Sequence, residues 1–411
     1  MKNDLFEYPI QSDQVIEKLI RWIDQNYAFY CLTFGNGHDY PEGTFPDQIL
    51  AGNTALEKGS LWEHSNYPAA GIISYDYKNQ LEKLSSKNPI LVKVPDLTFF
   101  KAELRITWDE DKIYSNQALP EKSLEGANTK FDSVPIEVQA LTSKEEYIHA
   151  FQAIQNEIIE GNTYEMNYCM AYQASFEKLD PAGSFFKLME LSPMPFSALF
   201  KSKNKYLISS SPERFLKKEA SRLIAQPIKG TSKRGKNKEE DEANKRILLQ
   251  SEKERAENLM ITDLMRNDLS KVSLIGSVHV LELFGVYSFP KVHQMISTVQ
   301  SELLPKTGLN EILQATFPMG SMTGAPKIST MELIEKFENF QRGWFSGALG
   351  IIQENGDFDF SVIIRSIIAD LETKKLYFAV GSAITIDAEA EQEYEECLLK
   401  ASALLEVLRG S

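Results

Sequence analysis

The sequence predicts an α+β fold built on antiparallel sheet, and three observations support this. Short strand-like segments follow one another closely, at residues 164–176, 196–201, 206–210, 215–218 and 223–228. Helical patterns separate groups of such strands instead of alternating with single strands, which argues against a regular βαβ arrangement. With 411 residues, 43% of them hydrophobic and 25% charged, the chain can bury a large core.

The N-terminal part begins with a predicted helix over residues 12–25. Ser12 can cap this helix, and apolar residues recur at helical spacing from Val15 to Ile23. From residue 27 to about 108, short apolar runs are broken by Gly, Pro and Asn clusters, which indicates sheet with long connections. Within it, residues 69–75 are typical of a buried strand. The polar segment 120–133 predicts a loop between this part and the rest.

The second part begins at Thr142, which with Glu145 predicts a capping box. The helix that follows carries one apolar stripe that includes Tyr147 and Phe151, and Gly161 is its expected end. The remaining expected elements are a long helix over about 239–269, strands over about 277–287, two helices of which the second starts at Pro326, strands over 345–353, 358–370 and 376–386, and a terminal helix over about 388–408.

Charge and cysteine content narrow the function classes. A formal charge of −14 argues against nucleic acid or an anionic membrane as the main partner, because both favour a basic surface. Cys31, Cys169 and Cys397 form no CxxC pair, which is typical of free thiols in a reducing compartment. The first ten residues do not read as a signal peptide, and no stretch reaches about 18 apolar residues. We expect a cytoplasmic protein.

Lys229 stands in the segment Pro227-Ile228-Lys229-Gly230-Thr231, between a ring that fixes φ and a residue without a side chain. One interpretation is a solvated loop lysine. The other is a nucleophile, which requires the neutral amine and therefore a pKa well below ~10.4. Burial, or crowding by nearby cations such as Lys233 and Arg234, would lower the pKa in that way.

Two pairs of glutamates lie three residues apart, Glu254 with Glu257 and Glu393 with Glu396. This spacing puts each pair on one helical face, and two such faces could hold Mg²⁺ through carboxylate oxygens. The alternative for the second pair is stabilisation by the N-terminal helix dipole. Glu213 lies between two predicted strands, where it could act as a general acid or form a surface ion pair with Arg214.

Three further segments are candidates for binding. On the strand predicted over 358–370, Arg365 shares the polar face and could hold a carboxylate bidentately; the alternative is a solvated sheet face. The small residues of Gly381-Ser382-Ala383 permit close approach of a ligand or of packed backbone. The turn from Gly320 to Lys327 lacks a Walker signature, so it is either an anion site at a helix start or a tightly packed turn. His293 is only slightly more informative than the other four histidines, which lack a recognisable partner in the sequence.

Together these segments resemble the chorismate-utilising enzyme family. The resemblance runs from about residue 147 to 408 and is weaker over 1–130. The motifs that carry it, in the family's order, are Gly161-Asn162-Thr163-Tyr164, Ser211-Pro212-Glu213-Arg214-Phe215, Pro227-Ile228-Lys229-Gly230-Thr231, residues 257–269, the Gly320–Lys327 turn, and Glu393-Tyr394-Glu395-Glu396 with Lys400.

The resemblance implies one intertwined unit over residues 1–411, with two packed antiparallel sheets, helices outside and a chorismate-binding region at 140–408. It implies that Glu257 and Glu396 bind Mg²⁺ directly, with Glu254 and Glu393 behind them. Arg365 would take the pyruvyl carboxylate of chorismate. The pocket would be lined by Thr231, Lys400, Gly381, Ser382 and Ala383, and His293 matches the family's active-site histidine.

Within the family, Lys229 resembles the aminodeoxychorismate synthase branch, since anthranilate synthases have alanine there and the water-using members have a lysine where this chain has Glu165. The implied reaction is attack of Lys229 on C2 of chorismate, loss of the C4 hydroxyl with a proton from Glu213, and entry of ammonia at C4. It leads toward para-aminobenzoate and folate, with ammonia supplied by a glutamine amidotransferase subunit.

Other interpretations stay open at this point. The chain could be an anthranilate synthase component I or another chorismate enzyme, or a catalytically silent subunit that binds chorismate or a glutaminase for regulation. Two departures from the family pattern bear on affinity. Ile351 replaces the usual tyrosine, and Ser382 and Ala383 make the glycine-rich triple bulkier.

Overall fold

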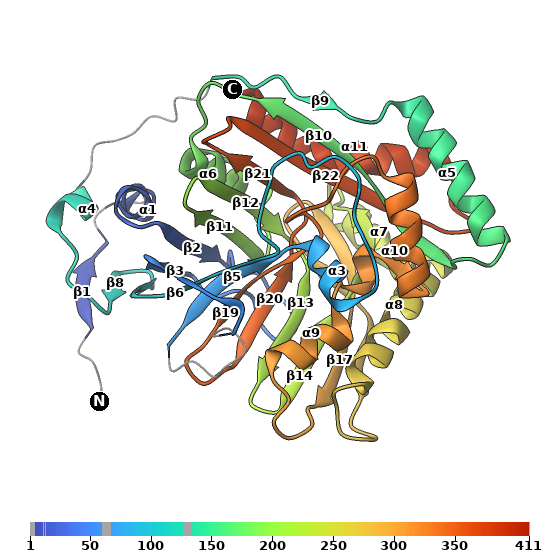
Figure 1. The fold of residues 1–411 in the computed structure, drawn as a ribbon, viewed down its shortest axis with the longest axis horizontal. Coiled ribbons are helices and arrows are strands. Elements are labelled where there is room, and N and C mark those ends of the chain that lie inside the picture. The colour runs from blue at the N-terminus through green and yellow to red at the C-terminus, as the bar shows by residue number, and fades with distance from the viewer. Residues whose placement is uncertain (1–4, 11, 13, 60–66, 126–133, 411) are drawn as a thin grey trace.

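The computed structural model describes residues 5–10, 12, 14–59, 67–125 and 134–410, and in this part of the chain every paired strand runs antiparallel within one of two large sheets (Figure 1). The predicted α+β class with antiparallel sheet is confirmed. The two sheets pack on a shared apolar core, in which Phe100 of one sheet stacks on Phe29 of the other at 5.8 Å between ring centroids. Thus the fold is a sandwich.

Neighbouring strands in each of the following series lie side by side in the sheet. Sheet A contains β1 (Phe6–Pro9), β8 (Lys112–Ser115), β7 (Leu104–Trp108), β3 (Gln48–Gly52), β2 (Phe29–Phe34), β11 (Phe196–Ser202), β12 (Lys205–Ser211), β21 (Ser366–Asp370), β22 (Lys375–Ile384), β10 (Glu165–Ser175) and β18 (Gly324–Ala325), with β9 (Gln139–Ala140) also on β10. Sheet B contains β15 (Ile228–Lys233), β17 (Val292–Glu302), β14 (Arg222–Gln226), β13 (Arg214–Glu219), β20 (Phe358–Val362), β19 (Ala348–Ile352), β5 (Ala69–Ile73), β6 (Leu97–Lys101) and β4 (Thr54–Leu56), with β16 (His279–Ser288) on β17.

Helices cover the outer faces. A second apolar core joins sheet A to α1 (Val15–Asn26), α5 (Lys144–Ile159), α6 (Pro181–Leu191) and α11 (Ala390–Arg409). On the other side α8 (Glu252–Ser270) packs on β15 and β17 (Figure 1). The remaining helical segments are η1 (Tyr75–Tyr77), α3 (Lys78–Leu81), α4 (Glu121–Glu125), α7 (Lys238–Gln250), α9 (Leu309–Thr316), η2 (Gly320–Met322) and α10 (Lys327–Phe337). No described helix is both long and apolar enough to cross a membrane.

Strands from the first 115 residues lie inside both sheets. β2 pairs with β11, and β5 pairs with β19. In each pair the second strand comes more than 150 residues later in the chain. The buried strand predicted at residues 69–75 is therefore confirmed as β5, at Ala69–Ile73. The predicted loop at 120–133 was partly wrong, because residues Glu121–Glu125 form α4, and residues 126–133 lie outside the described part.

Three predicted elements are each divided in two. The long helix breaks at Ser251, which takes an extended conformation and caps α8 by accepting a hydrogen bond from the Glu254 amide at 3.3 Å. Strand 223–228 ends before Pro227, which has no N–H to donate. Strand 358–370 crosses from sheet B to sheet A at Arg365, whose φ is 51°. Consequently Arg365 lies at a corner instead of on a strand face.

Two predicted helix starts are shifted, and several elements were missed. The capping box is made by Ser143 and Glu146, one residue later than predicted. Helix α1 begins after Gln14, whose amide donates to Ser12, so Ser12 does not cap the helix directly. Gly161 does follow α5, with a φ of 79°. The longest of the missed elements are α6 and β17, and Gln294 of β17 lines the pocket.

Candidate functional site

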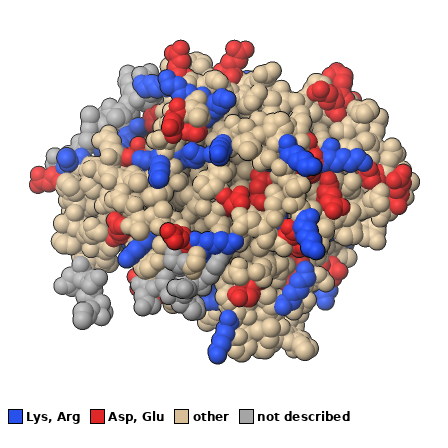
Figure 2. All heavy atoms as spheres, in the orientation of Figure 1, with Lys and Arg blue, Asp and Glu red and all other residues tan. Residues whose placement is uncertain are grey.

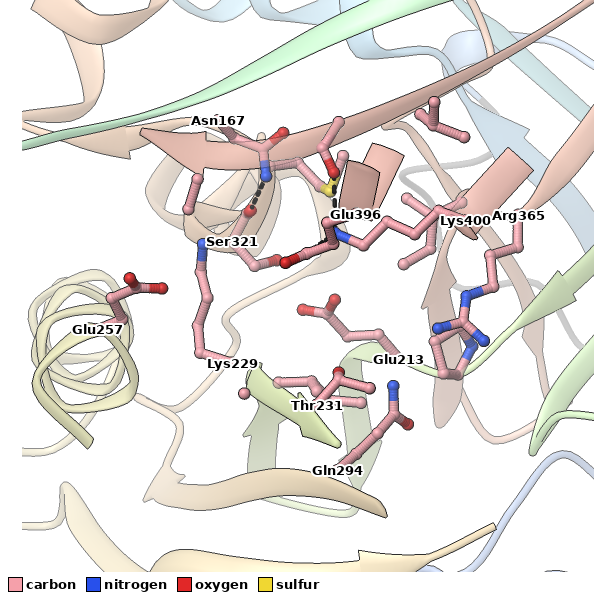
Figure 3. Close-up of a pocket in the computed structure, with 18 of the residues that line it drawn as sticks. Asn167, Glu213, Lys229, Thr231, Glu257, Gln294, Ser321, Arg365, Glu396 and Lys400 are labelled. Carbon is pink, nitrogen blue, oxygen red and sulfur yellow. Dashed lines mark hydrogen bonds and ion pairs between the residues drawn. The ribbon is translucent and has the colours of Figure 1, made fainter. Parts of the chain in front are cut away.

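One pocket lies where β15 and β17 of sheet B approach β10 and β22 of sheet A, between α8 and α11 (Figure 3). It gathers all the predicted site residues except His293 and Ser382. The lining residues are Asn167, Pro212, Glu213, Ile228, Lys229, Gly230, Thr231, Lys253, Glu254, Glu257, Gln294, Ser321, Met322, Phe345, Ile364, Arg365, Ala379, Val380, Gly381, Ala383, Glu393, Glu396 and Lys400.

Lys229 is held by β15 and by the helix that crosses it. The side-chain amide of Asn258, fully buried on α8, donates to the Lys229 carbonyl at 3.4 Å and to the Met295 carbonyl at 3.3 Å. Gly230 has a φ of 94°, and a Cβ there would lie 3.0 Å from Oε2 of Glu254. The positive φ and the close approach of α8 both favour glycine at this position.

The Lys229 ammonium is buried against carboxylates. Its Nζ lies 2.5 Å from Oε1 of Glu165, and the residue is 9% exposed. Burial alone would lower the pKa of Lys229, but Glu165, Glu257 and Glu213 outweigh it and raise the pKa. The prediction of a depressed pKa was therefore wrong for the free protein, because the neighbours are anions and not the expected cations. The solvated-loop interpretation is also wrong.

Glu213 projects into the pocket from the turn between β12 and β13 (Figure 3). Burial raises its pKa to about 7, although the nearby Lys229 ammonium acts in the opposite direction. The surface ion pair with Arg214 does not form, since Arg214 binds Asp359 at 2.8 Å instead. A carboxyl with a pKa near 7 is suited to general acid catalysis at neutral pH.

The four glutamates of the predicted metal site face one another across the pocket, two from α8 and two from α11. Among the described residues, no three His, Cys, Asp or Glu side chains lie close enough together to hold a metal ion. Lys253 donates to Glu393 at 3.0 Å and lies 4.0 Å from Glu257, and Lys400 pairs with Glu396 at 2.6 Å. Ammonium groups thus bridge or pair with three of these carboxylates.

Even so, this donor set fits a hard divalent cation. In the part of the chain that the structure describes, Oε1 of Glu257 is buried without a hydrogen-bond partner, and burial raises the pKa of Glu257 to about 7. Burial also raises the pKa of Glu254. Buried carboxylates that lack partners are stabilised by a cation, and oxygen ligands suit Mg²⁺.

Arg365 and Lys400 supply positive charge at the other end. The described residues within hydrogen-bonding distance of the Arg365 guanidinium are limited to Met194, whose sulfur is 3.8 Å away. Burial lowers the pKa of Arg365 to about 10, with Glu396 acting in the opposite direction. A buried guanidinium with so few polar partners among the described residues is well placed to receive a carboxylate of a ligand. Lys400 donates to the Gly381 carbonyl at 2.8 Å.

Strand alternation decides which small residues of β22 reach the pocket. Gly381 and Ala383 line it, whereas Ser382 points to the opposite face and its hydroxyl lies 2.9 Å from the Tyr147 hydroxyl. A Cβ on Gly381 would lie 2.5 Å from the Cys169 sulfur. The small residue at 381 therefore allows β10 and β22 to pack closely.

The same alternation on β17 separates His293 from the pocket. His293 is 1% exposed and its ring contacts Ser288 at 2.8 Å and Asp241 at 3.1 Å, while the next residue, Gln294, lines the pocket. Ile351 is buried in β19 within the core between the sheets. Neither His293 nor Ile351 is among the lining residues.

Sequence reasoning missed Asn167, Lys253, Gln294 and Ser321 of the lining, and the role of Glu165. Asn167 donates to the Ser321 carbonyl at 3.0 Å, which joins β10 to the Gly320–Lys327 turn. That turn is packed tightly, because Lys327 points to Asp268 and away from the pocket. Asn167 and Gln294 are polar residues within strands, so only the burial pattern of those strands could have indicated them, whereas Lys253 and Ser321 adjoin or lie within segments that the sequence did single out.

Comparison with known proteins gives a consistent family assignment. A profile of the chorismate binding enzyme family matches residues 40–406. The chain is 32% identical to aminodeoxychorismate synthase component 1 of Bacillus subtilis (strain 168) over 374 residues, which covers 84% of this chain and 77% of that protein. It is 39% identical to the chloroplastic aminodeoxychorismate synthase of Arabidopsis thaliana over 307 residues, covering 72% of this chain and 32% of that protein.

The chain thus spans about a third of the length of its plant and Streptomyces relatives. Among solved structures, anthranilate synthase component I from Streptococcus pneumoniae TIGR4 superposes with a TM-score of 0.75 at 25% identity, covering 92% of this chain and 90% of that one. The menaquinone-specific isochorismate synthase of Escherichia coli shares the fold, with a TM-score of 0.76 at 15% identity over 98% of this chain and 94% of that one.

Proposed function

This chain belongs to the chorismate binding enzyme family, and from that premise we propose that it converts chorismate and ammonia to 4-amino-4-deoxychorismate, for para-aminobenzoate and folate synthesis. The single observation that carries the proposal is a buried lysine, Lys229, in a pocket that also holds a carboxyl with a pKa near neutrality, Glu213. The curated relatives named aminodeoxychorismate synthase support it.

Chorismate is a dianion, and the pocket offers separate partners for its two carboxylates. Arg365 and the neighbouring Lys400 would bind the pyruvyl carboxylate. Mg²⁺ held by Glu257 and Glu396, with Glu254 and Glu393 behind them, would bind the ring carboxylate and supply the charge that offsets so many anions. Thr231, Gly381 and Ala383 then surround the ring, and small side chains there leave room for it.

The reaction assigns one task to each buried group. The Lys229 amine attacks C2, the ring double bonds shift, and the C4–O bond breaks. Glu213, protonated below about pH 7, gives its proton to the leaving hydroxyl, which departs as water. Ammonia then attacks C4, and the bond between C2 and Nζ breaks to return the lysine. The ionised Glu213 takes a proton from the new ammonium group.

Ammonia is expected from a glutamine amidotransferase subunit, since four of the relatives are named as component 1 of aminodeoxychorismate synthase. Acidic and basic side chains are interspersed on the face shown in Figure 2, in keeping with small-molecule and protein partners instead of nucleic acid. Cys31, Cys169 and Cys397 are free and buried, which agrees with the proposed cytoplasmic location.

Product identification tests this function directly. The purified chain is incubated with chorismate, Mg²⁺ and ammonium, and the product is separated by chromatography with mass detection. We expect 4-amino-4-deoxychorismate. The 2-amino isomer or anthranilate would indicate anthranilate synthase activity instead. Chorismate binding without turnover would indicate the silent subunit.

A further inference from the structure

Glu165 is the nearest charged group to Lys229, yet it does not line the pocket. It is 1% exposed and is not among the lining residues, whereas Lys229 lines the pocket. Its Oε1 contacts the Lys229 Nζ at 2.5 Å, and its Oε2 is buried with no hydrogen-bond partner among the described residues. Burying a carboxylate oxygen without a donor is energetically costly.

The backbone fixes Glu165 in this position. Residues Glu165 and Met166 pair with β18, and the Thr163 hydroxyl donates to the Glu165 carbonyl at 2.8 Å. Gly324 approaches so closely that a Cβ would lie 2.0 Å from that carbonyl oxygen. Gly324, in the Gly320–Lys327 turn, therefore permits the close approach of β18 to β10 that holds the Glu165 carboxylate against Lys229.

A nucleophilic Lys229 must first lose a proton, and its surroundings oppose the loss. The described charged groups that face it are Glu165 from β10, Glu213 from the β12–β13 turn, Glu254 and Glu257 from α8, and Glu396 from α11. Of these, Glu165 alone makes a hydrogen bond to Nζ within the described residues. This short contact gives the proton a direct path from Nζ to Oε1, and its transfer would convert two buried charges to two neutral groups.

Resting on the function proposed above, we propose that Glu165 is a catalytic base that takes the proton of Lys229 as the amine attacks chorismate. The ammonium gives one proton to Glu165 and becomes a neutral amine. Its electron pair forms the bond to C2, and the pair of the C4–O bond leaves with the hydroxyl, which becomes water with the proton of Glu213. When ammonia has entered at C4 and the amine is released, Glu165 returns its proton and the ion pair is restored.

The test compares Glu165→Gln with wild type and with Glu177→Gln, which removes an exposed carboxylate just beyond the end of the same strand. Steady-state rates are measured with saturating ammonium and Mg²⁺ from about pH 6 to 9. For Glu165→Gln we expect kcat to fall about 10²- to 10³-fold near pH 7 with KM for chorismate within a few-fold of wild type. The rate should rise with pH, relative to wild type, as the ammonium loses its proton to water. Glu177→Gln should match wild type throughout.

Wild-type kcat and an unchanged pH profile in Glu165→Gln would overturn the inference while leaving the lysine function intact. A wild-type chain that forms no amino product would overturn both. Circular dichroism and chorismate binding establish that the variant is folded. If it is not, Glu165→Asp replaces it, and we expect a reduced kcat with the wild-type pH profile, because the carboxylate is retained one methylene further away; an unreduced kcat would contradict the inference.

Discussion

At the scale of single residues, the site contains several buried charged groups, an arrangement that suits catalysis at the expense of stability. Lys229 is protonated and paired, Glu213 and Glu257 have pKa values raised to about 7, and Arg365 has a lowered pKa. Burial is the largest influence on each of these pKa values. For Glu213, Glu257 and Arg365 burial decides the direction of the shift, whereas for Lys229 the neighbouring carboxylates outweigh it. Such a cluster of perturbed groups in one pocket is typical of a functional site.

Glu213 should make activity and stability depend on pH in the same range. Because its folded pKa is raised above the ordinary value of 4.5, the unfolded chain binds fewer protons between about pH 4.5 and 7, and stability falls as pH rises through that window. Glu213→Gln should therefore be more stable than wild type above pH 7, by up to about 3 kcal/mol, and should lose most activity. Urea unfolding at pH 5 and pH 8 measures the difference; equal stability gains at both pH values would contradict this explanation.

Glu257 should couple metal binding to stability. Mg²⁺ should raise the melting temperature of the wild-type chain, since a ligand that binds only the folded state stabilises it. For Glu257→Gln, the Mg²⁺ concentration needed for the same rise in melting temperature should be at least tenfold higher, while the metal-free protein remains folded. Thermal melting across a Mg²⁺ titration provides the measurement, without any need for activity. An identical titration for the variant would remove Glu257 from the proposed ligands.

At the scale of elements, the sequence identified the residue types of the site but did not always predict where each side chain points. The glutamate pairs were predictable because i,i+3 spacing fixes one helical face. Arg365 was assigned to a strand face, yet the chain turns there from one sheet to the other, which only long-range pairing decides. His293 and Gln294 are adjacent, and which of them faces the pocket depends on the register of β17, a strand that local patterns did not reveal.

The contact between β15 and α8 supplies a test at this scale. Gly230 and Gly276 both have positive φ, but a Cβ on Gly230 meets Glu254 and Leu248, whereas a Cβ on Gly276 has no atom within 4 Å. Gly230→Ala and Gly276→Ala should each lose about 1 kcal/mol of stability from backbone strain, and Gly230→Ala somewhat more. Activity should fall only in Gly230→Ala, because the helix must shift away from Lys229. Equal activity in the two variants would show that this approach does not position the site.

At the scale of the whole molecule, both sheets are needed to form one pocket. Lys229 and Gln294 come from sheet B, and Asn167, Gly381 and Ala383 from sheet A, so the site exists only when the sandwich is closed. The general α+β class with antiparallel sheet followed from strand and helix patterns. The strand order, with early strands inserted among later ones, did not, because pairing over more than 150 residues leaves no local signal.

The chain should require an external source of ammonia. With ammonium salts we expect full turnover by the purified chain, and with glutamine alone less than a hundredth of that rate. Addition of a glutamine amidotransferase subunit should restore glutamine use. Glutaminase activity of the purified chain by itself, after exclusion of contaminating enzymes by size-exclusion chromatography, would contradict the proposed division of labour.

The most direct measurement for the central claim is mass spectrometry of the Lys229 peptide. Wild-type protein is mixed with chorismate and Mg²⁺ without ammonia, quenched and digested. We predict an adduct of chorismate less one water on the peptide that contains Lys229, and none in Lys229→Ala, which should still bind chorismate. Addition of ammonia should discharge the adduct and release 4-amino-4-deoxychorismate. Undiminished formation of that product by Lys229→Ala would contradict the account.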